Sequence, residues 1–239
     1  MTELIYQTDS YIKEFDAEVT SVLPEERVVV LNRTAFYPGG GGQPCDLGTL
    51  IVDGVTYPVN KVKKQGDDLL HFLSGDTALP AVGSAAHGRL DWERRYRLMR
   101  THTALHILCG TVFRDYGALV TGGEMEPGKG RLDFEFETMR GELVREIEAA
   151  INREAAQGRE IRVQILPREE AFQIPDLIRT KINLLPPGIS HVRTVEIVGL
   201  DLQADGGTHV HNTSEVGTIR VADYKSKGAI NKRIYIEIE

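Results

Sequence analysis

The hydrophobic pattern of this chain changes once, at Asp91, and that change constrains the fold more than any other feature. Before it, short apolar and β-branched runs alternate with turn residues, as in β-strands. After it, residues 91–117 place apolar side chains at largely helical spacing, with Asp91 as a candidate N-cap and Gly117 as a candidate stop. We therefore expect a mainly β N-terminal domain, residues 1–90, followed by an α+β domain, residues 91–239.

The first domain is expected to be a small β-barrel with a glycine-rich loop. Strands are predicted in "AEVTSVL", "RVVVLNRT", "LGTLIVDGVTYPVNKV", "DLLHFLS" and "SAAHGRL". Asp53-Gly54 lies between two strand-like runs, which is a strong hairpin signal. Several short strands at this spacing favour a barrel. Residues 39–42 are all glycine, so the backbone there can approach a ligand closely.

The second domain combines two long helices with a mixed or antiparallel sheet. After the helix of residues 91–117, "RLDFEFE" predicts a strand, and residues 138–158 predict a helix with Thr138 as its cap and Gly158 as its stop. Four further strands are predicted in "REIRVQIL", "HVRTVEIVGLDL", "VGTIRVAD" and "INKRIYIEIE". A short helix is expected in "REEAFQIPDLI", broken at Pro175. This order of elements is typical of an α+β domain.

Bulk features lead us to expect a cytoplasmic protein without a membrane span. No run of about 18 apolar residues exists, so no membrane span is expected. The start of the chain lacks the basic and apolar regions of a secretory signal. The two cysteines, Cys45 and Cys109, are too few for a disulfide framework and fit a reducing compartment.

The charge distribution leaves room for a nucleic-acid partner. The net charge of −7 disfavours such a partner on average. Basic residues nevertheless gather in "RRYRLMR" and in the C-terminal tail, where a phosphate backbone can dock locally. The candidate contacts are Arg94, Arg95, Arg97, Arg100, Lys225 and Lys227. The alternative is that each of them is an ordinary solvated surface charge.

Two histidines on the first predicted helix can hold a metal ion together. His102 and His106 are four residues apart and therefore lie on one helix face. Catalytic zinc sites use three protein ligands plus water, and this pair supplies two. Thr103 stands where H-E-x-x-H metalloproteases have their glutamate, so their general base is missing. The alternative is a pair of half-buried imidazoles satisfied by local hydrogen bonds.

A second segment, "DLQADGGTHVHN", can complete such a site. Asp205 and His209 bracket a glycine turn, so both side chains can face one point. A carboxylate is an acceptable zinc ligand. His211 would share the side of His209 only in an extended backbone, and a surface position is the better expectation for it. We expect one Zn²⁺ per chain, held by His102, His106, His209 and Asp205.

These segments carry a family resemblance. "RTHTALHIL", followed much later by "DGGTHVHNTSEVG", resembles the editing domain shared by alanyl- and threonyl-tRNA synthetases, and especially the free-standing AlaX-type trans-editing alanyl-tRNA hydrolases. The family motifs are H-x-x-x-H and C-x-x-x-H, and Asp205 replaces the cysteine. "AFYPGGGGQPCDLGTL" is similar to the glycine-rich region in the barrel of the longer family members. "VTGGEMEPGKGRLDFEF" and "KSKGAINKRIYIEIE" also follow the family pattern, so the resemblance covers nearly the whole chain.

The resemblance implies hydrolysis of mischarged aminoacyl-tRNA(Ala) in trans, with Ser-tRNA(Ala) as the chief substrate and Gly-tRNA(Ala) as a second one. A pocket rejects an added hydroxyl only about 10²-fold, whereas a second site that hydrogen-bonds the hydroxyl can discriminate by about 10⁴-fold or more. The candidate catalytic residues are Thr103 and Asp205. The candidate substrate-binding residues are Gly41, Gly42, Gln43, Thr121 and Thr208, although each threonine can instead satisfy local backbone groups.

Several alternatives stay open at the level of sequence. The metal can lower the pKa of a bound water from about 15.7 towards about 7, or it can position the substrate without ionising water. The chain can be a metal-dependent hydrolase of a small ester or amide on the same fold. It can also be a tRNA-binding module without activity, an idea that only the change to Asp205 supports. The oligomeric state is not predicted.

Overall fold

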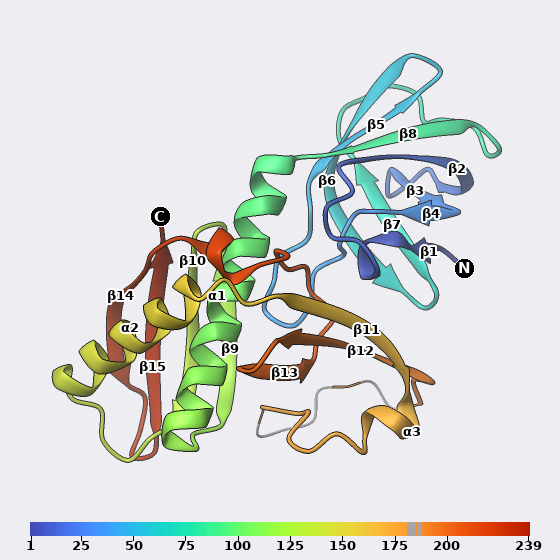
Figure 1. Ribbon diagram of the computed structural model, residues 1–239. Helices are drawn as coiled ribbons and strands as arrows, with labels where there is room; N and C mark the ends of the chain where they lie inside the picture. Colours follow the sequence, from blue (N-terminus) through green and yellow to red (C-terminus); the bar gives the residue numbers. More distant parts are fainter. Residues whose placement is uncertain (181–184, 186–187) are drawn as a thin grey trace. The chain divides into compact units, whose positions relative to one another are not determined.

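The computed structural model describes residues 1–180, 185 and 188–239, and the chain divides into two compact units, residues 1–96 and 97–239 (Figure 1). The division falls inside helix α1 (Trp92–Tyr116), six residues after the predicted boundary at Asp91.

The first unit is the β-barrel expected from the sequence. Its six strands close in the order β2-β3-β7-β6-β5-β8, and every neighbouring pair is antiparallel. The barrel strands are β2 (Glu14–Leu23), β3 (Val28–Leu31), β5 (Gly48–Val52), β6 (Val55–Gln65), β7 (Asp68–Leu73) and β8 (Ala85–Leu90). A short helix η1 (Ile5–Gln7) and the parallel pair β1 (Glu3–Leu4) and β4 (Arg33–Thr34) accompany them.

The predicted Asp53-Gly54 hairpin joins β5 to β6. Both residues have positive φ, 51° and 77°, which is the backbone of a type I′ turn and suits the twist of the flanking strands. Apolar side chains from all six strands meet in one cluster that includes the fully buried Val19, Leu31 and Leu50. The barrel interior is therefore filled by side chains.

Helix α1 begins and ends as the sequence predicts. The Asp91 Oδ1 atom accepts a hydrogen bond from the backbone N–H of Arg94 at 3.1 Å, which satisfies one of the unpaired donors of the first turn. Gly117 follows the last helical residue with φ of 67°, a conformation that glycine adopts without steric cost.

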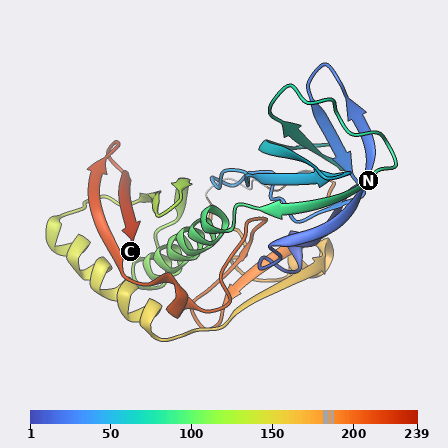
Figure 2. The same ribbon diagram turned by 90° about the horizontal axis from the view of Figure 1, so that it is seen from above.

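The second unit contains two antiparallel sheets rather than the single sheet expected. The larger has the order β14-β15-β10-β9, and the smaller has the order β11-β12-β13. The elements are β9 (Val120–Glu126), β10 (Lys129–Glu135), α2 (Gly141–Ala156), β11 (Ile161–Pro167), α3 (Arg168–Ala171), β12 (His191–Ile197), β13 (Asp201–Ala204), η2 (Thr213–Val216), β14 (Ile219–Ser226) and β15 (Asn231–Ile238). From Arg97 onwards, α1 lies between the two sheets (Figures 1 and 2).

Three local features of this unit differ from the predictions. The single strand expected over residues 191–202 is two strands, because the chain reverses after β12 at Gly199, whose φ is 74°. Strand β9 was not predicted, since Gly122 and Gly123 weaken its strand pattern. Thr138 does not cap α2: the residue before the helix is Arg140, which makes no side-chain capping bond.

Both cysteines are free thiols. Among the helices that the structure describes, none combines the length and the apolar character needed to cross a membrane.

Candidate metal centre

The two histidine-bearing segments meet inside the second unit. His102, His106, Asp205 and His209 each offer one ligand atom, and these four atoms lie within 4.8 Å of one another. The ring centroids of His102 and His209 are 4.3 Å apart, and those of His106 and His209 are 4.6 Å apart. All three imidazoles are buried. The arrangement is the convergence that the sequence predicts for a metal centre.

Helix α1 and strand β13 bring the ligands together. His102, His106 and Gly110 follow one another at intervals of four residues and therefore line one face of α1. A Cβ atom on Gly110 would lie only 2.8 Å from the Cβ of Asp201. The glycine thus permits a close approach of β13 to the helix, and β13 leads directly into Asp205.

The carboxylate of Asp205 is held facing the imidazoles. Its Oδ2 atom accepts a hydrogen bond from the backbone N–H of Gly207 at 2.8 Å and lies 3.1 Å from His209 Nε2. Its Oδ1 atom lies 3.6 Å from His102 Nε2. The buried Arg193 donates from Nη1 to the backbone carbonyl of Asp205 at 2.9 Å. The glycine turn and Arg193 therefore fix the position from which Asp205 can bind an ion.

Burial sets the protonation states that a metal needs. It lowers the pKa of His102 well below the ordinary value, and it lowers the pKa of His209 to about 4. Burial raises the pKa of Asp205, but the adjacent imidazoles outweigh it and hold that pKa well below its usual range. Two neutral imidazoles and an ionised carboxylate are the forms that coordinate a cation.

His106 differs from the other two imidazoles. Burial lowers its pKa, but the carboxylates of Asp201 and Asp205 outweigh burial, so the pKa of His106 is raised overall. An imidazole coordinates an ion in its neutral form, so the affinity of this site for a metal should fall as the pH is lowered. Three nitrogen donors and one oxygen donor otherwise fit a tetrahedral Zn²⁺ ion.

The predicted threonines lie in different places. Thr103 is buried beside the cluster: its Oγ1 atom is 3.1 Å from His209 Nδ1 and accepts a hydrogen bond from the backbone N–H of Val210 at 3.4 Å. Thr208 is buried next to His209. The exposed Thr121 donates its hydroxyl hydrogen bond to Asn231 Oδ1 at 3.0 Å, which ties it to the larger sheet.

His211 lies outside the group of four ligands. It is exposed, and its backbone N–H donates to Glu215 Oε1 at 3.1 Å. This agrees with the expectation of a surface imidazole.

The glycine-rich loop of the first unit is a tight turn. Gly40 and Gln43 exchange two backbone hydrogen bonds, at 3.0 Å and 2.9 Å. Gly41 and Gly42 form the exposed tip between them with φ of 59° and 90°, values that favour glycine strongly. Gln43 is buried. A contact of these residues with substrate stays a prediction.

The prediction that Arg95 binds nucleic acid is wrong. Its side chain is fully buried in the first unit, where Nε lies 3.0 Å from each carboxylate oxygen of Asp46. Its other nitrogens donate to the carbonyls of Ser10 at 2.9 Å and Ala35 at 2.6 Å. Because its hydrogen-bonding capacity is used internally, this guanidinium is unavailable to a phosphate.

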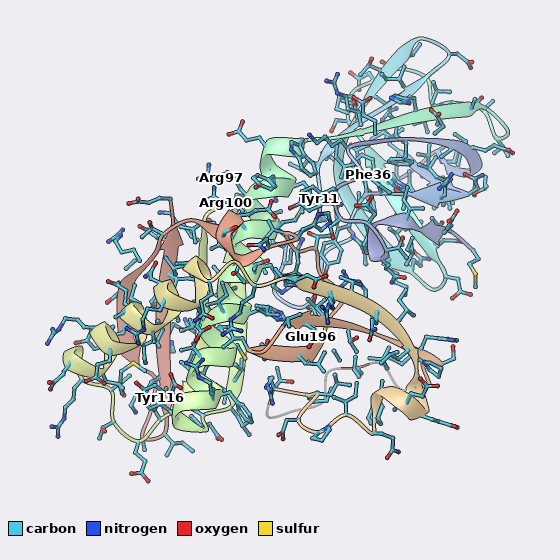
Figure 3. The ribbon with its side chains drawn as sticks, viewed as in Figure 1. Tyr11, Phe36, Arg97, Arg100, Tyr116 and Glu196 are labelled. Carbon is cyan, nitrogen blue, oxygen red and sulfur yellow. The ribbon has the colours of Figure 1, made fainter. Side chains whose placement is uncertain are left out.

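The other basic candidates are partly engaged within the protein. Arg94 donates weakly to the carbonyl of Cys45 at 3.4 Å. Arg100 donates to the carbonyls of Glu215, Val216 and Glu239, so much of its guanidinium is occupied. Arg97 is exposed, and both Arg97 and Arg100 lie towards the start of α1, at the opposite end from Tyr116 (Figure 3). Lys225, which pairs with Asp223 at 3.1 Å, and Lys227 are also exposed.

Sequence reasoning missed Asp201 and the two side chains that hold it, Arg179 and Gln203. Asp201 Oδ2 lies 3.2 Å from His106 Nδ1. Its place at the end of a supposed single strand gave no reason to expect it near α1. The signal that points to it is Gly110, a residue without a side chain on the ligand-bearing face of the helix.

Comparisons with known proteins agree with this geometry. Residues 192–235 match the family described as the threonyl and alanyl tRNA synthetase second additional domain, and residues 5–94 match the one described as tRNA synthetases class II (A). The alanyl-tRNA editing protein AlaX-M of Saccharolobus solfataricus is 41% identical over the full length of both chains. The AlaX-M protein of Methanosarcina acetivorans is 36% identical over 100% of this chain and 99% of its own.

Alanine–tRNA ligases are also related. The enzyme of Ignicoccus hospitalis is 39% identical over 92% of this chain, which corresponds to 24% of the ligase. The similarity to the ligases therefore concerns one region of a much longer protein, whereas the similarity to the editing proteins is end to end. The chain belongs to the AlaX-M family of alanyl-tRNA editing proteins.

Proposed function

We propose that this protein hydrolyses mischarged aminoacyl-tRNA(Ala) in trans, with Ser-tRNA(Ala) as its chief substrate and Gly-tRNA(Ala) as a second one. The observation that carries the proposal is the meeting of three buried imidazoles and one carboxylate at motifs shared with the editing family. Relatives that match over the full chain are named alanyl-tRNA editing proteins. A zinc ion held by His102, His106, His209 and Asp205 is part of the proposal.

The reaction is hydrolysis of the ester between the amino acid and the terminal ribose. The oxygen of a water molecule adds to the ester carbonyl carbon, the bond to the ribose oxygen breaks, and that oxygen takes up a proton as the amino acid leaves as a carboxylate. When bound, a zinc ion stabilises the negative charge that develops on the carbonyl oxygen. As a ligand, Asp205 would hold the ion; it can accept the proton of the attacking water only if it does not bind the ion.

Thr103 is suited to recognise the serine hydroxyl. Its Oγ1 atom accepts from Val210 N–H, and it can accept from His209 Nδ1 as well. Those two bonds leave its own O–H proton uncommitted and able to donate to a substrate hydroxyl. A site that bonds the hydroxyl discriminates against alanine by about 10⁴-fold, because alanine leaves the buried donor unpaired.

The decisive experiment uses tRNA(Ala) charged with serine, glycine or alanine, with and without a chelator. Rapid release of serine, slower release of glycine and retention of alanine are expected, and the chelator should stop all release. A free seryl ester serves as the comparison substrate. If the ester is cleaved as fast as Ser-tRNA(Ala), the protein is a small-ester hydrolase; if nothing is cleaved while tRNA still binds, it is a binding module.

Binding of tRNA is expected to involve exposed basic residues of the second unit. Replacing Arg97 and Lys227 together by alanine should weaken tRNA binding and flatten its dependence on salt, since each lost phosphate contact lowers the log–log slope by about 0.7 to 0.9. Filter binding at several salt concentrations measures both effects.

Lys63→Ala with Lys64→Ala is the matched control for this experiment. This double substitution also removes two positive charges, but from exposed positions on β6 of the barrel. If the salt dependence of tRNA binding changes only in the Lys63 and Lys64 variant, the tRNA binds to the first unit instead.

A further inference from the structure

Asp201 is a buried carboxylate beside the candidate metal centre to which the proposed function gives no role. Its side chain is completely buried, and its Oδ2 atom lies 3.2 Å from His106 Nδ1. This distance is that of an ion pair, although the N–H is not aligned on the oxygen as in a hydrogen bond. A buried imidazole N–H requires an acceptor, and Asp201 Oδ2 lies within reach of His106 Nδ1.

Two neighbours hold Asp201 in this orientation. Gln203 Nε2 donates to Asp201 Oδ2 at 2.6 Å and to Cys109 Sγ at 3.3 Å. Arg179 Nε lies 3.3 Å from the other carboxylate oxygen. The carboxylate therefore cannot turn away from His106 without losing bonds on both of its oxygens.

The backbone reinforces the arrangement. His106 and Gly110 are one helical turn apart on the same face of α1. A side chain at Gly110 would meet the Cβ of Asp201 at 2.8 Å and the carbonyl of Leu200 at 3.1 Å. The absence of that side chain lets Asp201 lie directly beside the ligand-bearing face.

The Nδ1 atoms of His106 and His209 face different groups: a carboxylate in one case and a hydroxyl in the other. An ionised carboxylate only accepts hydrogen bonds, so Asp201 requires the proton of His106 on Nδ1 and leaves Nε2 for a metal. The hydroxyl of Thr103 can either donate to His209 Nδ1 or accept from it. His209 Nε2 also lies 3.1 Å from Asp205 Oδ2, a hydrogen bond that needs the proton on Nε2 when no ion is bound.

We propose that Asp201 is a positioning residue that keeps a proton on His106 Nδ1 and aims Nε2 at the metal, so that His106 is a preformed ligand whereas His209 changes tautomer when the ion binds. The inference rests on the zinc site of the proposed function. Carboxylates that accept from a metal-bound imidazole orient the ring, and their loss weakens metal binding by about 10- to 100-fold.

Long-range ¹H–¹⁵N correlation spectra of the histidine rings test the proposal on the unaltered protein. His106 should carry a proton on Nδ1 both without metal and with one equivalent of Zn²⁺. His209 should move its proton from Nε2 to Nδ1 on zinc addition. A zinc-loaded protein in which His106 is protonated on Nε2 would overturn the proposal.

Zinc affinity measured by competition with a chelator supplies the second test. Asp201→Asn and Asp201→Ala should weaken zinc binding by about 10- to 100-fold, the alanine variant more than the asparagine one. Asp133→Asn is the matched control: it neutralises a buried carboxylate of the larger sheet that pairs with Arg233 and lies outside the group of four ligands, and it should bind zinc nearly as tightly as the unaltered protein. Thermal melting verifies that each variant is folded.

Two outcomes would count against Asp201. Folded Asp201→Asn that binds zinc with unchanged affinity would show that the carboxylate does not act through His106. An equal loss in Asp133→Asn would assign the effect to the general loss of a buried carboxylate and not to the contact with His106. Neither measurement involves tRNA. If zinc binding behaves as expected but Ser-tRNA(Ala) is not hydrolysed, the proposed function is refuted and the role of Asp201 stands.

Discussion

His102→Ala and His209→Ala are each expected to abolish hydrolysis of Ser-tRNA(Ala) and to leave the purified protein with little bound zinc. Each substitution removes one of four convergent donors, and the remaining three cannot enclose the ion on that side. A metal ion contributes several kcal/mol to stabilising the transition state, so a loss of roughly 10³-fold or more in rate is expected. Deacylation assays and metal analysis by mass spectrometry measure the two effects on the same preparation.

Asp205→Cys is the control that separates loss of a ligand from general damage. Thiolate is the donor that the family motif has at this position, so the variant should hold zinc at least as tightly if Asp205 is itself a ligand. Retained zinc with lost activity would instead identify Asp205 as the base that accepts the proton of water. Full activity in both histidine variants would end the metal hypothesis.

Asp46→Ala is expected to cause the largest loss of stability, about 3–5 kcal/mol, because it leaves the fully buried guanidinium of Arg95 without its counter-charge. The same substitution removes the acceptor for the backbone N–H of Tyr37, which Asp46 Oδ2 binds at 2.7 Å. Chemical denaturation followed by fluorescence measures the change in the free energy of unfolding.

Arg97→Ala is the appropriate comparison for Asp46→Ala. It removes a charge from an exposed position on the same helix as Arg95, and its effect on the free energy of unfolding should stay within about 0.5 kcal/mol. Equal stability of the two variants would mean that the Arg95–Asp46 pair contributes nothing to the barrel.

The sequence predicts the parts of the structure that depend on local spacing. The four-residue interval between His102 and His106, the cap at Asp91 and the Asp53-Gly54 turn each follow from short-range geometry, and the structure agrees with all three. The contact between the segment around His102 and the segment around His209 is predicted only by the two motifs taken together. Each motif alone also fits an ordinary structural role.

Long-range pairing is what the sequence does not predict. Arg95 stands among other arginines and cannot be told apart from them by sequence, because its partner Asp46 is 49 residues earlier in the chain. Asp201 was placed inside one long strand, because the reversal at Gly199 interrupts an otherwise continuous β pattern. In both cases the surroundings of the side chain depend on a contact between distant residues, which local periodicity does not predict.

The separation of the ligands along the chain has a consequence for biosynthesis. A nascent polypeptide that has folded only through α1 presents His102 and His106 alone, since Asp205 and His209 emerge about a hundred residues later. In the proposed site, two imidazoles would hold an ion far less firmly than four donors do, so metal loading would wait until residues 205–209 have been made. Hydrolysis that depends on the proposed ion would therefore begin only after the segment around His209 has folded onto α1.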